Sequence, residues 1–129
     1  MKNLLVVFIA LFTHTLFAQD AKVEINIQNL SKKWVFKDVI NPEKNATDLA
    51  EMREMLAATT LQLNQDGSYI FDFVDTRKGT WMLDAANKLI TLKENNRAAK
   101  NEWTVHSLTK NELIASRNEA TQKIVFTAQ

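Results

Sequence analysis

The chain contains 129 residues, of which 46% are hydrophobic and 24% are charged, with two glycines, one proline and no cysteine. This composition is typical of one small folded domain, and it argues against a disordered or collagen-like chain. The absence of cysteine excludes stabilisation by disulfides. The formal net charge of +1 implies no electrostatic attraction to nucleic acid or to an anionic membrane, so we expect no nucleic-acid partner.

Residues 1–18 have the layout of a secretory signal peptide, because Lys2 precedes an apolar run and the small residue Ala18 supplies a cleavage site. An uncleaved membrane anchor is the alternative. Polar residues 13–15 interrupt the run, however, and leave it shorter than the roughly 20 residues that a bilayer-spanning helix needs. A chain without cysteine also cannot carry the bacterial lipid anchor. The sequence therefore predicts an exported domain over residues 19–129, periplasmic or extracellular, with no membrane span or lipid anchor after cleavage.

The first part of the mature chain contains one ambiguous segment and one clear strand. Residues 21–30 alternate as in a strand but also fit one face of a helix, so we expect an edge strand or a short segment that closes one end. Residues 33–40 predict a strand, with Trp34 on one face and Val39 on the other.

One helix is expected next. Asn41 can cap it, Pro42 suits its first position, and Glu43 favours the positive end of the helix dipole. The helix formers continue to about Ala57. The helix either packs over one end of a sheet to bury the core, or forms a lid over a ligand cavity, which adaptable methionines would suit. The apolar stripe of this candidate lid comprises Leu49, Met52, Met55 and Leu56.

The stretch from Leu61 to Asp84 predicts three consecutive antiparallel strands, because apolar residues recur at every second position and Gly67 and Gly79 mark two reversals. Four more strands are expected over residues 88–93, 102–108, 112–116 and 122–128. Together with the first strand they make about eight. This plan predicts an all-β fold, a small antiparallel up-and-down β-barrel with one helix between strands 1 and 2, and leaves a two-sheet sandwich as the alternative.

The order and spacing of several motifs resemble the secreted lipocalin-like domain proteins of Bacteroidetes-type bacteria. The motifs are Trp34, then Leu61-x-Leu63-x-x-Asp66-Gly67-Ser68-Tyr69, then Gly79-Thr80-Trp81-x-Leu83-Asp84, then Trp103-x-Val105-x-x-Leu108-x-x-x-Glu112-Leu113. The resemblance covers roughly residues 30–127. It implies a lipocalin-type barrel outside the cytoplasm, in a family mostly without assigned activity. No ligand contact is carried over from that family.

Many aromatic side chains are expected inside this barrel, and they lead to two functional hypotheses. If they leave room, the protein is a binding module that holds a small hydrophobic ligand. If they fill the interior, it is a non-catalytic interaction protein that docks a partner in the envelope through its outer face or an unclosed edge strand. The candidate barrel-lining residues are Trp34, Phe36, Tyr69, Phe71, Trp81, Trp103 and Phe126.

Catalysis finds little support in the sequence. With no cysteine, and with His106 as the only histidine after cleavage, a Cys-His nucleophile and a His-rich metal site are both excluded. We expect His106 on the outer face of its strand, and acid pairs such as Asp72 and Asp75 in solvent. No glycine-rich phosphate loop occurs. The sequence therefore predicts neither an enzyme nor a metal or cofactor site, and it leaves the oligomeric state open.

Overall fold

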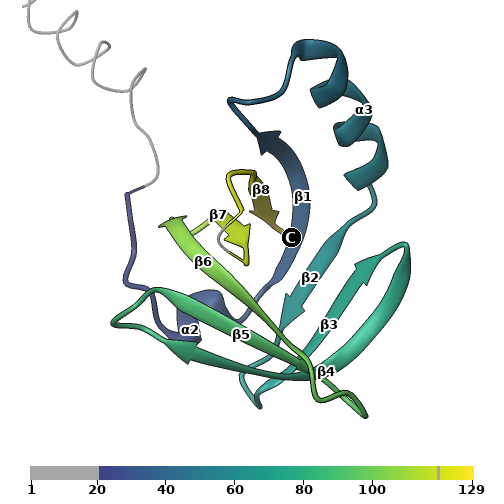
Figure 1. The fold of residues 1–129 in the computed structure, drawn as a ribbon. Coiled ribbons are helices and arrows are strands. Elements are labelled where there is room, and N and C mark those ends of the chain that lie inside the picture. Colours follow the sequence, from purple (N-terminus) through teal and green to yellow (C-terminus); the bar gives the residue numbers. More distant parts are fainter. Residues whose placement is uncertain (1–20, 119) are drawn as a thin grey trace, which may run out of the picture.

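The computed structural model describes residues 21–118 and 120–129, so the predicted signal peptide lies outside the described residues. The described residues form a closed antiparallel barrel in which each strand pairs with the next and β8 returns to pair with β1 (Figure 1). The β1–β8 pairing excludes the two-sheet sandwich and confirms the all-β barrel prediction. The strands are β1 (Lys33–Ile40), β2 (Thr60–Leu63), β3 (Ser68–Phe73), β4 (Asp75–Asp84), β5 (Leu89–Glu94), β6 (Lys100–Leu108), β7 (Glu112–Arg117) and β8 (Lys123–Ala128).

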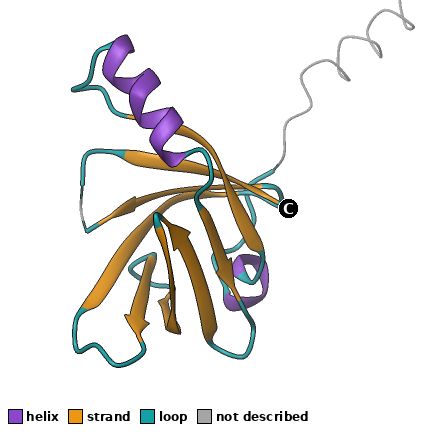
Figure 2. Ribbon diagram, turned by 90° about the vertical axis from the view of Figure 1, so that its right-hand side faces the viewer, coloured by secondary structure: helices purple, strands orange, loops and turns teal. Residues whose placement is uncertain are grey.

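Two short helices lie at opposite ends of the barrel, because one precedes β1 and the other follows it (Figure 2). They are α2 (Ile27–Leu30) and α3 (Ala46–Leu56). We call the end next to α2 the closed end and the end next to α3 the open end. Among the described residues, no helix has the length and apolar character needed to cross a membrane.

The closed end is formed by the segment whose structure the sequence left ambiguous. Asn26 caps α2 by accepting a hydrogen bond from the Asn29 backbone N–H, and Leu30 is completely buried. The Trp34 indole N–H donates to the Leu30 carbonyl over 2.9 Å. Residues 27–30 therefore close one end as a short helix, which confirms a closing segment. No edge strand forms in residues 21–26 before this helix, and a single β-bridge between Lys22 and Thr109 takes its place.

The helix between β1 and β2 begins four residues later than predicted. Its N-cap is Asn45, whose side chain accepts from the Asp48 N–H over 2.8 Å. Asn41 instead makes a local turn, because its side-chain oxygen accepts from the Glu43 N–H and its amide donates to Gln122. The helix therefore does not begin at Asn41, and the predicted cap there is wrong. The side chain of Asn41 is buried and is held by Gln122 and the Glu43 N–H.

Two register shifts redirect side chains that strict alternation placed on the outside. One lies in β1 between Phe36 and Asp38, and the other lies in β6 between Val105 and Ser107. An extra residue in one strand reverses the side-chain alternation beyond it. Val39 and Leu108 consequently point inward and are buried, where the sequence predicted the face opposite Trp34 and Trp103.

The two glycines have different roles, and only one marks a reversal. Gly67 has φ +89° in the turn between β2 and β3, as predicted. Gly79 lies inside β4, and the reversal before that strand occurs at Val74, which has φ +64°. A Cβ at Gly79 would lie 1.9 Å from the Lys93 carbonyl oxygen, so glycine permits close approach of β4 and β5 there.

Replacing Gly79 with alanine should lower the free energy of unfolding by about 3 kcal/mol, because the new methyl group meets backbone rather than a flexible side chain. Gly67→Ala is the matched control. It meets no atom within 4 Å and should cost only about 1 kcal/mol for its left-handed backbone. Urea unfolding of both variants measures the difference, and equal losses would contradict this role of Gly79.

Candidate functional site

The interior is filled at the closed end and hollow at the open end. Buried side chains near α2 include Leu30, Trp34 and Leu113, each with essentially no exposed surface. At the open end two adjoining cavities of about 130 and 180 Å³ enter the barrel. The residues that border both cavities are Phe71, Phe73, Trp103 and Arg117. We call the space formed by these two cavities the mouth pocket.

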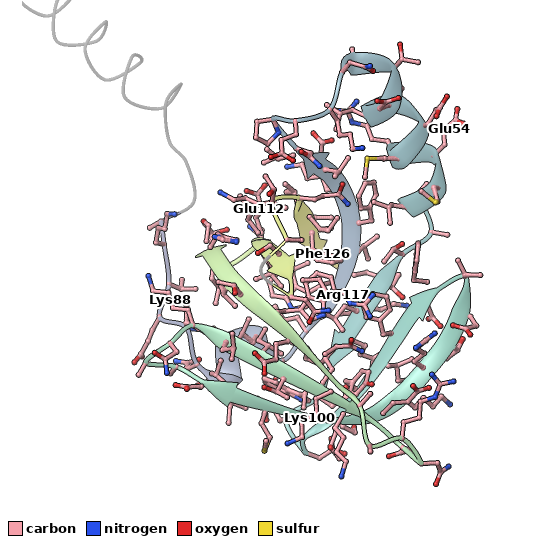
Figure 3. All side chains as sticks on the ribbon, in the orientation of Figure 1. Glu54, Lys88, Lys100, Glu112, Arg117 and Phe126 are labelled. Atoms are coloured by element: carbon pink, nitrogen blue, oxygen red, sulfur yellow. The ribbon has the colours of Figure 1, made fainter. Side chains whose placement is uncertain are left out.

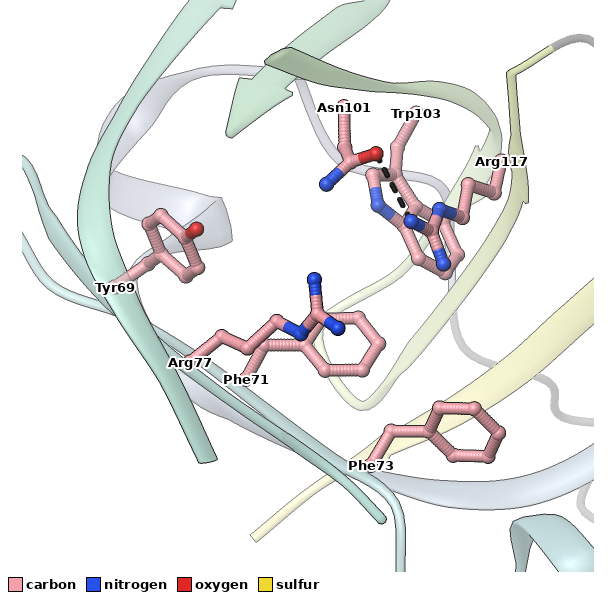
Figure 4. A pocket seen from close by; sticks show the side chains of 7 residues that line it. All are labelled: Tyr69, Phe71, Phe73, Arg77, Asn101, Trp103 and Arg117. Carbon is pink, nitrogen blue, oxygen red and sulfur yellow. Dashed lines mark hydrogen bonds between the residues drawn. The ribbon is translucent and has the colours of Figure 1, made fainter. Parts of the chain in front are cut away.

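The pleat of β3 and β4 places one wall of the mouth pocket. Tyr69, Phe71 and Phe73 alternate along β3 and all border the first cavity. Arg77 on β4 lies directly opposite Phe71 in the antiparallel register. Because directly opposed residues in such a pair project to the same face of the sheet, the Arg77 side chain enters the pocket beside the Phe71 ring (Figure 4).

The apolar part of the mouth pocket centres on the Trp103 ring. Its centroid lies 5.9 Å from the Phe71 ring in a tilted arrangement and 6.1 Å from the Phe126 ring in an edge arrangement. These separations suit favourable aromatic contacts. Leu56 and Ile124 border the same cavity. The result is a concave surface of rings and aliphatic side chains that can hold an apolar group.

Two arginines and an asparagine form the polar part of the mouth pocket. Arg117 lies directly opposite Trp103 in the β6–β7 register, and its guanidinium donates to the Asn101 side-chain oxygen over 2.9 Å (Figure 4). In Figure 3, Arg117 lies within the outline of the barrel, whereas Lys88 lies at its periphery. No carboxylate of the described residues lies within ion-pair distance of Arg117, whereas Arg77 has acidic partners.

Those partners of Arg77 are Asp75, at 3.3 Å, and Glu94, at 3.7 Å. Glu94 also pairs with Arg97 over 3.3 Å. The charge of Arg77 is therefore largely balanced at the rim. The residues that border the first cavity include both arginines and no acidic residue, so the cavity itself is positively charged.

The three tryptophans differ in how their indole N–H groups are satisfied. Trp34 donates to the Leu30 carbonyl and Trp81 donates to the Asn64 carbonyl, over 2.9 and 2.8 Å. The Trp103 nitrogen is buried and has no hydrogen-bond partner among the described residues. A buried donor without a partner is costly and uncommon. The wall of the mouth pocket therefore contains a donor whose hydrogen bond is not made by the described residues.

Tyr69 stands at the bottom of the first cavity and is only 2% exposed. Burial raises the pKa of its hydroxyl, the nearby Glu94 raises it further, and Arg77 opposes both effects. Since the ordinary pKa of tyrosine is already far above neutrality, the Tyr69 hydroxyl stays protonated at pH 7. It can therefore donate a hydrogen bond as well as accept one.

The structure separates the predicted barrel-lining residues into two groups. Tyr69, Phe71, Trp103 and Phe126 border the mouth pocket. Trp34 and Trp81 instead belong to the filled part, where each indole is tied to a backbone carbonyl. Phe36 is half-buried against the core opposite Phe126, and it borders neither cavity.

The candidate lid residues are also divided. Leu56 borders the cavity of about 180 Å³ in the mouth pocket. Leu49 and Met55 instead border separate hollows on the outer surface. Met52 is half-buried against the core. The helix is tied to β1 by an ion pair of 2.7 Å between Arg53 and Asp38. Helix α3 thus covers the end of the barrel beside β1 and reaches the mouth pocket through its last turn.

Sequence reasoning missed the three polar residues of the mouth pocket. The sequence predicts Arg77 in a turn that ends at Gly79, and Arg117 in the turn after the strand of residues 112–116. Had the alternation of Gly79 and Trp81 been extended backwards along β4, it would have placed Arg77 inside. No comparable signal existed for Asn101, which was assigned to a polar loop but lies in β6.

His106 is exposed and lies 2.7 Å from the Ser116 hydroxyl through its Nε2 atom, which confirms its expected place on the outer face. Burial lowers its pKa, and the positive charge of Lys123 lowers it further. Within residues 21–118 and 120–129, no group of three or more acidic residues or histidines could hold a metal ion.

Two solved structures have a similar fold. A DUF4847 family protein from Bacteroides vulgatus superposes with a TM-score of 0.55 at 15% identity, covering 78% of this chain and 94% of that one. A protein from Bacteroides uniformis superposes with a TM-score of 0.54 at 18% identity, covering 84% and 94%. No protein-family model and no curated protein matches the sequence. At these identities the similarity establishes an eight-stranded barrel of this kind and nothing about a ligand.

Trp34→Phe should destabilise the protein more than Trp103→Phe, although both remove the same volume. The first change breaks a buried hydrogen bond worth about 1 kcal/mol, whereas the second removes a buried donor that has no described partner. We expect free energies of unfolding that differ by about 2 kcal/mol in chemical denaturation. A larger loss for Trp103→Phe would show that its indole nitrogen has a structural partner.

Proposed function

We propose that this protein is an exported, lipocalin-like binding protein, periplasmic or extracellular, which holds a small molecule with an apolar body in the mouth pocket and performs no chemistry on it. The observation that carries the proposal is the contrast between the two ends of the barrel. The closed end is packed and covered by α2, whereas the open end is hollow and lined by aromatic rings. If both ends served only to complete the core, side chains would fill the open end as they fill the closed end.

The dimensions of the mouth pocket limit the ligand. Its cavities, of about 130 and 180 Å³, even together reach only the lower end of the range of roughly 300–1,000 Å³ typical of sites for drug-sized ligands. A cavity of about 150 Å³ is enough for one benzene molecule. A single ring or a short chain therefore suits the mouth pocket, and a long-chain lipid or a retinoid does not.

The alternative of an interaction protein with a filled barrel receives less support. Strand addition needs an edge strand with unpaired backbone groups. Each of the described strands has a neighbour on both sides along part of its length. Residues 38–40 of β1 pair with β8 alone, so the free edge is only a few residues long. Docking through the outer face would leave the hollow open end without a role.

The indole N–H signals of the three tryptophans provide a direct test by NMR. Titration with benzyl alcohol, a neutral probe of the right size, should move the Trp103 signal and leave those of Trp34 and Trp81 in place, because only Trp103 borders the mouth pocket. Equal shifts of all three signals, or no Trp103 shift with this probe or with its charged analogues benzoate and benzylamine, would contradict the proposal.

A blocking variant provides the control for this titration. Ala120 is exposed and borders the cavity of about 180 Å³, so Ala120→Phe should fill the mouth pocket and abolish the Trp103 shift. Ala86→Phe adds the same ring at an exposed turn of the closed end, and it should leave the titration unchanged. Loss of binding in both variants would point to a general effect of the added ring.

A further inference from the structure

We propose that the ligand of the mouth pocket carries a carboxylate, which Arg117 and the indole N–H of Trp103 bind while its apolar body lies against the aromatic rings. This inference rests on the proposed binding function and adds the chemical class of the ligand. Three features of the described residues support it: an arginine that forms no ion pair with a described acidic side chain, a buried donor without a described partner, and a wall in which no described side chain is acidic.

The charge of the pocket calls for an anion. Arg117 and Arg77 both border the first cavity, and none of its described lining residues is acidic. Arg77 is balanced by Asp75 and Glu94 at the rim, whereas the described contacts of the Arg117 guanidinium are limited to the amide oxygen of Asn101. Arg117 is exposed, so water screens its charge, but no acidic side chain of the described residues balances it. One carboxylate would balance it, and a dianion would exceed it.

The unsatisfied indole nitrogen calls for an acceptor. Trp103 is 4% exposed, and its Nε1 atom is buried without a partner in the described part of the chain. An indole N–H can only donate, so the group that completes it must supply an oxygen or a similar acceptor. In Figure 4 the Trp103 ring lies beside Asn101 and Arg117 at the wall of the pocket.

The register of the strands brings these donors to one place. Arg117 lies directly opposite Trp103 across the β6–β7 pair, and Arg77 lies directly opposite Phe71 across the β3–β4 pair. Directly opposed residues have Cβ atoms about 5 Å apart, and the Phe71 and Trp103 rings are 5.9 Å apart. A planar carboxylate can therefore lie along the guanidinium of Arg117 and still accept from the Trp103 N–H.

Asn101 supports this arrangement through Arg117. This side chain holds Arg117 over 2.9 Å and so orients its guanidinium before the ligand arrives. The neutral hydroxyl of Tyr69 lies in the same cavity and can donate to the same anion. The aromatic surface of Phe71, Trp103 and Phe126 then receives the rest of the molecule. A small aromatic or short-chain acid satisfies all of these groups at once.

Three probes of nearly equal size and different charge test the inference on the mature chain at pH 7. They are benzoate, benzyl alcohol and benzylamine, with Kd measured by the Trp103 indole shift and by calorimetry. We expect benzoate to bind at least about tenfold tighter than benzyl alcohol and benzylamine to bind most weakly, since charge-assisted hydrogen bonds are the stronger kind. The preference for benzoate should diminish as the ionic strength rises.

Two arginine variants at the open end separate a specific contact from a general effect of charge. Arg117→Gln should bring the Kd of benzoate to within about threefold of that of benzyl alcohol and leave benzyl alcohol binding unchanged. Arg97→Gln removes an exposed arginine that borders neither cavity, and it should leave both constants unchanged. Equal loss of benzoate binding in the two variants would overturn the assignment to Arg117.

The remaining outcomes distinguish the two proposals. If benzyl alcohol binds at Trp103 and benzoate binds no tighter, the carboxylate inference is wrong and the binding function stands. If phenyl phosphate binds tenfold or more tighter than benzoate, the site is for a dianion and the inference is likewise wrong. If none of the probes moves the Trp103 signal, the proposed function itself fails.

Discussion

The pairing of β8 with β1 is the constraint on which the rest of this structure depends. It closes the sheet, so that every described strand has two neighbours and the inward side chains share one limited interior. Because β1 carries α2 before it and α3 after it, closure also places the two helices at opposite ends. The large inward side chains must then share this one interior, and it stays hollow wherever they do not fill it.

The competition among three tryptophans for this interior explains why the two ends differ. Trp34 and Trp81 each find a backbone carbonyl near the closed end, which lets their rings be buried without an unsatisfied donor. Trp103 lies farther toward the open end and has no such carbonyl among the described residues. Its ring completes the aromatic surface. Its indole N–H has no acceptor, and the Arg117 guanidinium has no acidic partner, among the described residues. The same residue thus serves the core and defines the mouth pocket.

Much of the fold could be predicted because alternation is a local signal. All eight strands lie close to their predicted positions, and the single helix between the first two was expected. Errors occurred where one residue changed the alternation. The bulges near Asp38 and His106 turned Val39 and Leu108 inward, and the extension of β4 back to Asp75 moved Gly79 from a turn into a strand. Such shifts depend on cross-strand pairing, which the sequence of one strand does not encode.

The sequence by itself determined the number of strands, the aromatic character of the interior and the absence of cysteine chemistry. These follow from residue type and from a periodicity of two, both of which are readable along the chain. Only the tertiary structure decided which aromatics share the mouth pocket, and that Arg77, Asn101 and Arg117 join them. Those residues come from three strands, and they meet because the barrel closes and its register sets Arg77 opposite Phe71 and Arg117 opposite Trp103. Asn101 precedes Trp103 by two residues on β6 and therefore shares its face.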